Sequence, residues 1–268
     1  MIDNFSLHKK NIILTGAAGI LGQKLSQGFL DAGANLALLD IDKKSLKDLK
    51  NKLITNSYNR FITYEVDITN QEQVEQTINE VATEFKSIDV LHNNAATKGD
   101  SLEEFSKPFE EYKLSTWNAV MNGNLTSMFI MTQAVGKIMK KQKFGSIIQT
   151  SSIYGVVTPD KELYKGSNYN GLEISTPAIY SVSKKGVIGL TKYLASYWGE
   201  YNIRVNSISP GGIFSGQNEE FIKKYSKKVP LGRMAVEKDI LGITIFLASD
   251  ASSYITGQNI VIDGGFSI

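Results

Sequence analysis

The feature that most constrains the fold of this chain is the alternation of short apolar runs with longer segments of helical periodicity. The short runs are rich in β-branched residues and predict seven strands, at 11–15, 35–40, 61–66, 88–92, 145–150, 203–209 and 259–262. Apolar residues three or four positions apart predict helices at 20–32, 42–52, 71–85, 116–141, 178–199 and 237–248. Strands separated by helices imply parallel pairing with helices on both faces. The sequence therefore predicts one α/β domain, residues 1–268, around a doubly wound, seven-stranded parallel sheet.

The composition of the chain excludes several kinds of chemistry. There is no cysteine, which rules out disulfides, thiolate metal sites and a cysteine nucleophile. The only histidines are His8 and His92, so we expect no metal site. A net charge of +2 gives no general reason to expect nucleic acid or an anionic membrane as a partner. The first residues contain only a short apolar run, and we expect a protein of the cytoplasm without a membrane span.

A glycine-rich turn directly follows the first predicted strand. Gly16, Gly19 and Gly22 lie in the sequence TGAAGILG, which runs into a helix. Glycines in such a turn bring backbone N–H groups against a pyrophosphate and let the helix pack closely on the strand. A glycine-rich turn that binds nothing is the alternative. We predict a dinucleotide site here, with Ile20 and Leu21 beside the glycines.

The second predicted strand ends in a carboxylate, Asp40. At this position a carboxylate accepts hydrogen bonds from the adenosine ribose of NAD and repels the 2′-phosphate of NADP. The sequence therefore favours NAD(H) as the cofactor. In the alternative, Asp40 caps the helix at 42–52, a role for which Asp42 is an equally good candidate.

Polar residues also follow the third and fourth predicted strands. Asp67 and Ile68 follow the third strand, and Asn93, Asn94 and Ala95 end the fourth. Ligands of open α/β sheets bind outside the carboxyl ends of the strands. Asp67 is a candidate acceptor for the adenine amino group, and Asn93 a candidate support for the adenosine. In the alternative, Asp67 caps the following helix and the asparagines are only turn residues.

A tyrosine and a lysine lie one helical turn apart at the start of the helix at 178–199. Tyr180 and Lys184 are four residues apart and share a helix face. A phenol is a poor base at neutral pH, and a nearby ammonium lowers its pKa toward a useful range. Upstream, Ser151 and Ser152 end the fifth strand and bring a hydroxyl to the same edge of the sheet.

The order of these motifs resembles that of the classical short-chain dehydrogenases/reductases, which share a Rossmann fold. The matching segments cover almost the whole chain and read TG…G…G, NNAA, WNAVMNGNLT, SSIYG, YSVSK, IRVNSISPGGI and VIDGG. The spacing TGxxGxxG is closer to the extended branch of the family. Extended members carry a further C-terminal substrate domain, whereas this sequence ends soon after the seventh strand. The classical branch is therefore favoured.

The resemblance implies a role for each matching residue. Tyr180 is the general acid/base, Lys184 lowers its pKa and holds the nicotinamide ribose, and Ser152 rather than Ser151 orients the carbonyl. Asn124 holds a proton-relay water, unless it is only a buried hydrogen-bonding group that kinks its helix. Four further residues are expected near the nicotinamide: Pro210, Gly211, Ile213 and Ser215.

Two long segments, 155–177 and 211–230, fit neither a strand nor a long helix, and we expect them to be substrate loops. The stretch from Ser152 to Tyr180, which includes the first segment, contains tyrosines, asparagines and a carboxylate that suit a hydroxylated or amino-bearing sugar: Tyr154, Tyr164, Asn168, Tyr169, Asn170 and Glu173. A surface loop packed by its own tyrosines is the alternative. The two segments are also similar to those of bacterial oxidoreductases of surface-sugar and flagellin-modification pathways, including those that make legionaminic-acid-type sugars.

The predicted function is interconversion of a secondary alcohol and a ketone with NAD(H), on a small-molecule substrate such as a sugar or nucleotide-sugar of surface glycan biosynthesis. Other substrate classes are 3-oxoacyl compounds, polyols and gluconate-type acids. Two alternative functions are an epimerase or dehydratase that retains NAD, and a non-catalytic NAD sensor. The resemblance also implies a homotetramer or homodimer, paired through the helices at 116–141 and 178–199.

Overall fold

The computed structural model describes residues 3–55, 59–99, 101–169, 172–173 and 175–268. Its strands are β1 Asn11–Thr15, β2 Asn35–Asp40, β3 Phe61–Glu65, β4 Val90–Asn93, β5 Gly145–Thr150, β8 Ile203–Pro210 and β9 Asn259–Ile262, with a two-stranded hairpin, β6 Asn168–Tyr169 and β7 Leu172–Glu173. The helices are α1 Ile20–Asp31, α2 Lys43–Lys52, α3 Gln71–Phe85, α4 Leu102–Phe105, α5 Leu114–Met121, α6 Ser127–Gln142, α7 Ala178–Trp198, α8 Glu219–Lys228 and α9 Glu237–Ala248.

The seven long strands form one parallel sheet in the order β3-β2-β1-β4-β5-β8-β9. This order reverses direction between β1 and β4, which is the strand order of the Rossmann fold. The predicted α/β fold is therefore confirmed, and each predicted strand is present with ends that differ by at most two residues. Because all seven strands are parallel, their carboxyl ends lie along one edge of the sheet.

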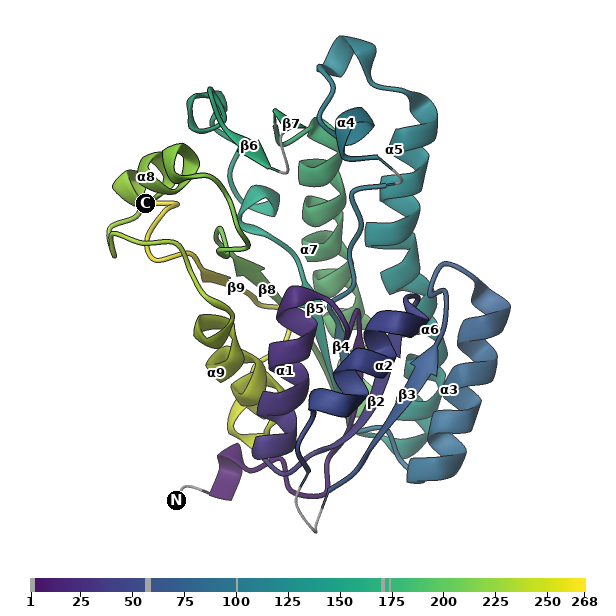
Figure 1. Ribbon diagram of the computed structural model, residues 1–268. Helices are drawn as coiled ribbons and strands as arrows, with labels where there is room; N and C mark the ends of the chain where they lie inside the picture. Colours follow the sequence, from purple (N-terminus) through teal and green to yellow (C-terminus); the bar gives the residue numbers. More distant parts are fainter. Residues whose placement is uncertain (1–2, 56–58, 100, 170–171, 174) are drawn as a thin grey trace.

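Helices cover both faces of this sheet (Figure 1). Within β1, Ile13 packs into the core beneath α3, α6 and α7, whereas Ile12 and Leu14 pack into the core beneath α1 and α9. Successive side chains of a strand point to opposite faces, so a strand buried on both sides requires a continuous apolar run. This explains why the strands lack an alternating polar pattern.

The predicted helix at 116–141 is not continuous. It is divided into α5 and α6 by a π-helical turn, Asn122–Thr126. A π turn adds one residue to the helical repeat and commonly occurs at functional sites. The side chain of Asn124 is buried within this turn.

The segment 211–230, which we expected to be irregular, contains α8. Asn218 caps its N-terminus by accepting a hydrogen bond from the Phe221 N–H. Phe221 and Tyr225, one turn apart, are buried in a small separate core with Leu163 of the segment 155–177. The sequence analysis did not predict this short helix, because two buried apolar residues at helical spacing are too few to reveal it.

The segment 155–177 is folded into short turns and the β6–β7 hairpin above the carboxyl edge of the sheet (Figure 1). Asn170, which we named as a candidate pocket residue, lies outside the described residues, and so do the side chains of Tyr169 and Glu173.

Over the part of the chain that the structure describes, no helix combines the length and apolar character that crossing a bilayer requires.

Candidate active site

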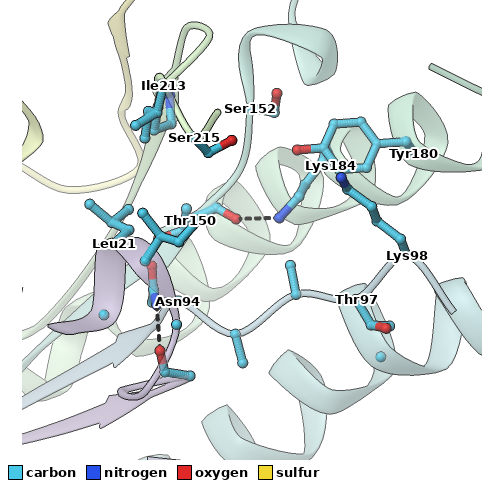
Figure 2. A pocket seen from close by; sticks show the side chains of 18 of the residues that line it. Leu21, Asn94, Thr97, Lys98, Thr150, Ser152, Tyr180, Lys184, Ile213 and Ser215 are labelled. Carbon is cyan, nitrogen blue, oxygen red and sulfur yellow. Dashed lines mark hydrogen bonds between the residues drawn. The ribbon is translucent and has the colours of Figure 1, made fainter. Parts of the chain in front are cut away.

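A cavity of about 940 Å³ runs along the carboxyl ends of the strands. Of the predicted catalytic and cofactor residues, all but Asn93 and Asn124 line this cavity, and of the predicted substrate-loop residues Tyr154 and Tyr164 line it. One end, here called the glycine end, is formed by the turn at Gly16–Gly22 and the loops after β2 and β3. The other, called the Tyr180 end, is formed by Tyr180, Lys98 and the residues around Ser152. Figure 2 shows Leu21 and Asn94 on one side of the cavity and Tyr180 and Lys98 on the other.

The glycine-rich turn is packed too tightly for side chains at two positions. Gly16 has a φ of +64°, and a Cβ there would lie 2.8 Å from the Cα of Ala95. A Cβ on Gly22 would lie 2.0 Å from the Gly16 carbonyl oxygen. Asn94 holds the turn from below, since its amide donates to the carbonyl oxygens of Thr15 and Gly16 at 3.1 and 3.3 Å (Figure 2).

The N-terminus of α1 opens directly from this turn. Its N-cap residue is Gly19, which has no side chain to satisfy the first N–H groups of the helix. Such a terminus carries partial positive charge and free donors, which together suit a phosphate group. The close-packed glycines and this uncapped terminus fit the pyrophosphate of a dinucleotide.

Asp40 lies at the end of β2 beside the glycine-rich turn. Its carboxylate accepts hydrogen bonds from the N–H groups of Ala18 at 2.9 Å and Asp42 at 3.1 Å. The cap of α2 is Asp42, which accepts from the Ser45 N–H at 3.0 Å. The alternative in which Asp40 caps α2 is therefore wrong. A carboxylate fixed at this edge of the cavity fits ribose hydroxyls and disfavours a phosphate.

The structure corrects two further sequence interpretations, which concern Asp67 after β3 and Asn93 at the end of β4. Asp67 accepts from the N–H and hydroxyl of Thr69, whereas the cap of α3 is Asn70, so Asp67 does not cap that helix. Asp67 and its neighbour Ile68 both line the cavity. Asn93 is buried beneath the cavity floor and donates to side chains of α6 and β5. The support that we expected from Asn93 comes instead from Asn94.

The two serines after β5 have different surroundings. The Ser151 hydroxyl donates to the backbone carbonyl of Lys184 at 2.7 Å and ties the end of β5 to α7. Ser152 lies beside Tyr180 with its hydroxyl in the cavity, where it accepts from the Tyr154 N–H at 3.2 Å. Both serines line the cavity, but the Ser151 hydroxyl is engaged by the Lys184 carbonyl, so Ser152 stays the predicted substrate-orienting serine.

Lys184 is buried beneath Tyr180. Only 2% of its surface is exposed, and its ammonium donates to the Thr150 carbonyl oxygen at 2.9 Å (Figure 2). The same nitrogen lies 5.8 Å from the centre of the Tyr180 ring. Burial disfavours the charged form and lowers the pKa of Lys184 to about 8.

Tyr180 lies above this lysine in an apolar setting. The ring of Phe105 meets it edge-on, with centroids 6.3 Å apart. Burial raises the pKa of the Tyr180 phenol, and the hydrogen bond with Ser152 acts in the opposite direction. We expected a pKa lowered by Lys184. In the structure desolvation is the larger influence, because the same pocket that brings the two groups together also removes water from the phenol.

Asn124 lies outside the cavity lining, within the π turn. Its side-chain oxygen accepts a hydrogen bond from the Thr97 N–H at 2.7 Å. Its amide nitrogen is buried and has no partner among the residues that the structure describes. The sequence alternative of a buried group that interrupts its helix agrees with this geometry, and the role in a proton relay stays a prediction.

The sequence analysis named Tyr154 and Tyr164 but missed Lys98 and Thr176, which also line the cavity. Lys98 lines the cavity from the loop after β4, and Tyr154, Tyr164 and Thr176 line it from the segment 152–177. The position of Lys98 five residues after Asn93, at the ligand-binding edge of the sheet, is a signal that could have revealed it.

Comparison with known proteins finds similarity over nearly the whole chain. A family model described as enoyl-(acyl carrier protein) reductase matches residues 16–267. An NAD-dependent glycerol dehydrogenase of Listeria innocua is 33% identical over 99% of this chain and 96% of its own length. The 3-oxoacyl-[acyl-carrier-protein] reductase FabG of Thermotoga maritima is 34% identical over 98% of this chain and 99% of its own length.

Two further similar proteins are a dehydrogenase with bound NAD+ and a protein of flagellin modification. The crystal structure of a short-chain dehydrogenase from Leptospira borgpetersenii with bound NAD+ has a TM-score of 0.83 and 33% identity, covering 100% of this chain and 96% of that one. The post-translational flagellin modification protein A of Campylobacter coli is 31% identical over 98% of this chain and 100% of its own length.

Proposed function

The chain belongs to the short-chain dehydrogenase/reductase family, and on that basis we propose that it interconverts a secondary alcohol and a ketone with NAD(H). One observation carries the proposal. Ser152, Tyr180 and Lys184 line the same cavity as the glycine-rich turn, so acid/base groups and a dinucleotide would share one enclosed space. The chain is therefore an oxidoreductase whose reaction is expected at the Tyr180 end.

The cofactor would extend along the strand ends. When bound, NAD+ accepts a hydride from the alcohol carbon, and NADH returns one to the ketone. The turn at Gly16–Gly22 would hold the pyrophosphate, and Asp40 the adenosine ribose. Other residues would line the remainder of its path: Asp67, Ile68, Asn94, Ala95, Pro210, Gly211, Ile213 and Ser215.

Each catalytic side chain would have a separate task. As the phenolate, Tyr180 Oη would take the proton of the substrate hydroxyl during oxidation, and as the neutral phenol it would return that proton during reduction. Ser152 Oγ holds the substrate oxygen beside Tyr180. Lys184 presents its ammonium beneath the phenol and is fixed by the Thr150 carbonyl oxygen, which keeps positive charge where phenolate character develops. Asn124 would position a relay water with its buried amide.

NAD is proposed as the preferred cofactor over NADP. Asp40 lines the glycine end of the cavity, where the adenosine ribose would bind, and a carboxylate there would repel the 2′-phosphate of NADP. The Listeria relative named as NAD-dependent and the NAD+-bound Leptospira structure support this choice.

The proposed substrate is hydroxylated, with a sugar of surface glycan biosynthesis as one setting. The hydroxyls of Tyr154, Tyr164 and Thr176 in the cavity support a polar substrate, and the flagellin-modification relative supports the setting. A 3-oxoacyl substrate is the second candidate, since the Thermotoga maritima relative is named as a 3-oxoacyl-[acyl-carrier-protein] reductase. A cytoplasmic location is proposed because the chain lacks cysteine.

We also propose that the chain forms a homodimer or homotetramer through α6 and α7. A groove of about 380 Å³ on these helices is lined by small and apolar residues, among them Phe129, Gly186 and Tyr193. Phe129 and Tyr193 are both exposed in the single chain, and pairing of two copies would bury them. Light scattering on the purified protein tests the assembly, and a monomer at micromolar concentration would contradict it.

The activity is tested by following NADH formation from NAD+ with polyols, sugars, nucleotide-sugars and simple secondary alcohols, and NADH consumption with 3-oxoacyl compounds. Tyr180→Phe is expected to lower kcat by about 10²- to 10⁴-fold, the usual contribution of positioned acid/base catalysis. The affinity for NADH should change little. Turnover that persists in Tyr180→Phe would contradict the assigned role.

NADH binding without turnover of any compound would favour the NAD-sensing alternative. Cofactor retained through purification, with conversion of a substrate but no net redox change, would favour an epimerase or dehydratase.

A further inference from the structure

The loop after β8 lies where the two ends of the cavity meet. Ile213 and Ser215 of this loop both line the cavity. Figure 2 shows Ser215 between Leu21 of the glycine end and Tyr180. A dinucleotide whose pyrophosphate lay on the glycine-rich turn and whose reactive carbon faced Tyr180 would have its nicotinamide against this loop. The groups that fix the loop would therefore also fix the nicotinamide.

The side chain of Gln217 makes three hydrogen bonds within this loop. Its amide oxygen accepts from the Ser215 N–H at 2.7 Å. Its amide nitrogen donates to the Ile213 carbonyl oxygen and to the Ser215 hydroxyl, each at 3.1 Å. Gly216 has a φ of +92° and lets the chain turn back, so that Gln217 reaches Ser215. Gln217 itself lines the cavity and is only partly exposed.

The two ends of the Gln217 amide cannot be exchanged. A backbone N–H only donates, so the atom bonded to the Ser215 N–H must be the amide oxygen. A backbone carbonyl only accepts, so the atom bonded to Ile213 must be the amide nitrogen. The Ser215 hydroxyl therefore accepts from Gln217, and its own hydrogen has no acceptor among the residues that the structure describes. That hydrogen is left to donate to a ligand in the cavity.

The rest of the loop is held independently of Gln217. The N–H of Gly211 donates to a carbonyl oxygen of β9, and the N–H of Phe214 donates to a carbonyl oxygen just before α9, both at 2.8 Å. The N–H of Gly212 donates to the hydroxyl of Tyr225 in α8. A substitution of Gln217 should therefore act at the end of the loop without unfolding the domain.

On the basis of the proposed function, we infer that Gln217 is a positioning residue for the nicotinamide. It keeps the Ser215 hydroxyl as a hydrogen-bond donor for the carboxamide oxygen and holds the Ile213 main chain beside it. All three hydrogen bonds of Gln217 lie within the loop, so its influence should be confined to the nicotinamide and should not reach the adenosine.

The test compares NADH with ADP-ribose, which has the adenosine, the pyrophosphate and the second ribose but no nicotinamide. Binding of each to the purified protein is measured by calorimetry. Gln217→Met keeps the length of the side chain and removes its three hydrogen bonds. The Kd for NADH should rise by about 5- to 10-fold, the range of one neutral hydrogen bond. The Kd for ADP-ribose should stay unchanged.

Gln217→Glu reverses the hydrogen bond to Ser215 in a side chain of the same size. A carboxylate would accept from the Ser215 hydroxyl and draw its hydrogen away from the cavity, and it has no donor for the Ile213 carbonyl oxygen. NADH binding should weaken at least as much as in Gln217→Met, again with ADP-ribose binding unchanged. The matched control is Gln76→Met, at an exposed glutamine of α3 that does not line the cavity, and it should change neither affinity.

Ser215→Ala tests whether Gln217 acts through the hydroxyl. This variant should also weaken NADH binding by about 5- to 10-fold and leave ADP-ribose binding unchanged. Gln217→Met added to Ser215→Ala should weaken NADH binding by less than the product of the two single effects, since the two residues support one interaction. In steady-state kinetics of Gln217→Met, the KM for NAD+ should rise, whereas the KM for the alcohol should not.

Two binding results would overturn the inference: affinities for NADH and ADP-ribose that fall equally in the Gln217 variants, or an NADH affinity that does not fall in them. Independent effects of Gln217→Met and Ser215→Ala would also overturn it, because Gln217 would then not act through the hydroxyl. Failure of the proposed function has a different signature. The Gln217 variants would still lose affinity for NADH alone, but no compound would give Tyr180-dependent turnover.

Discussion

The glycine end of the cavity is made mostly of main chain, whereas the Tyr180 end is made mostly of side chains. At the glycine end, Gly16 and Gly22 remove side chains, and Asn94 acts by holding backbone carbonyls in place. At the Tyr180 end, the side chains of Ser152, Tyr180 and Lys184 line the cavity. Main-chain groups are the same in every sequence, so the glycine end suits a cofactor that does not vary. The side chains of the Tyr180 end can differ with the substrate.

The two ends also differ in how their geometry is maintained. The turn at Gly16–Gly22 lies between β1 and α1, both packed in the sheet core. The Tyr180 end depends on the segment 155–177 and α8, which share a small separate core built around Phe221 and Tyr225. Substitutions at the glycine end should therefore affect folding and cofactor binding together, and those at the Tyr180 end should affect turnover separately.

The largest effect is expected from the two adjacent serines at the Tyr180 end. Ser152→Ala should lower kcat/KM by about 10²- to 10³-fold, the usual result of removing one donor to the reacting oxygen, with the melting temperature unchanged. Ser151→Ala should instead lower the free energy of unfolding by about 1–2 kcal/mol, because the carbonyl of Lys184 loses its buried donor. Steady-state kinetics and chemical denaturation of both variants test this. Exchanged behaviour of the two serines would contradict the assignment.

The next effect concerns the glycine end. Gly16→Ala should destabilise the fold by at least about 1–2 kcal/mol, the cost of a left-handed conformation for a residue with a Cβ. Contact of the new methyl group with Ala95 adds to this cost. The Kd for NADH should rise together with the loss of stability. Gly242→Ala is the control, since its Cβ meets no atom within 4 Å; equal effects of the two variants would argue against a strained turn.

The buried lysine links the Tyr180 end to pH. The folded-state pKa of Lys184 is about 8, below its ordinary value of 10.5. Below pH 8 the amine is protonated in the folded and in the unfolded chain. The desolvation of the buried ammonium then destabilises the folded chain by its full free-energy cost. Between pH 8 and 10.5 the folded chain loses this proton while the unfolded chain keeps it. The cost of burial therefore decreases as pH rises through this window.

Lys184→Met should accordingly raise the free energy of unfolding by about 2–3 kcal/mol at pH 7, from a shift of about 2.5 units less the lost hydrogen bond to Thr150. The gain in the free energy of unfolding should be smaller when denaturation is repeated at pH 10. Turnover should be lost at pH 7 and at pH 10. A variant less stable than the parent at pH 7 would mean that the hydrogen bond of Lys184 outweighs its desolvation.

The smallest effect is expected at Asp40. Asp40→Ser removes the charge that opposes the 2′-phosphate of NADP. The ratio of kcat/KM for NADP+ to kcat/KM for NAD+ should therefore rise by about tenfold or more, which is the usual effect of one contact with a charged group. Ser keeps a hydroxyl near the N–H of Ala18, which limits the structural change. An unchanged cofactor ratio would move the origin of the NAD preference away from β2.

Features that depend on a few consecutive residues were predictable from the sequence. The seven strands, the turn at Gly16–Gly22 and the spacing of Tyr180 and Lys184 all belong to this group. The helix α8 was not predicted, because its buried face contains only Phe221 and Tyr225. The π turn at Asn124 was also missed, since its surroundings have the same apolar spacing as a continuous helix.

What the sequence by itself determined is therefore the sheet, the glycine-rich turn and the one-turn spacing of Tyr180 and Lys184, because backbone conformation responds to local glycines and to apolar periods of two and 3.6 residues. The tertiary structure alone decided that the Ser151 hydroxyl is engaged by a carbonyl 33 residues downstream, whereas the Ser152 hydroxyl is not. It also brought Thr176 and Tyr225 from two distant segments into one cavity. These contacts have no local signal, because the direction and surroundings of a side chain are set by the elements that pack against it.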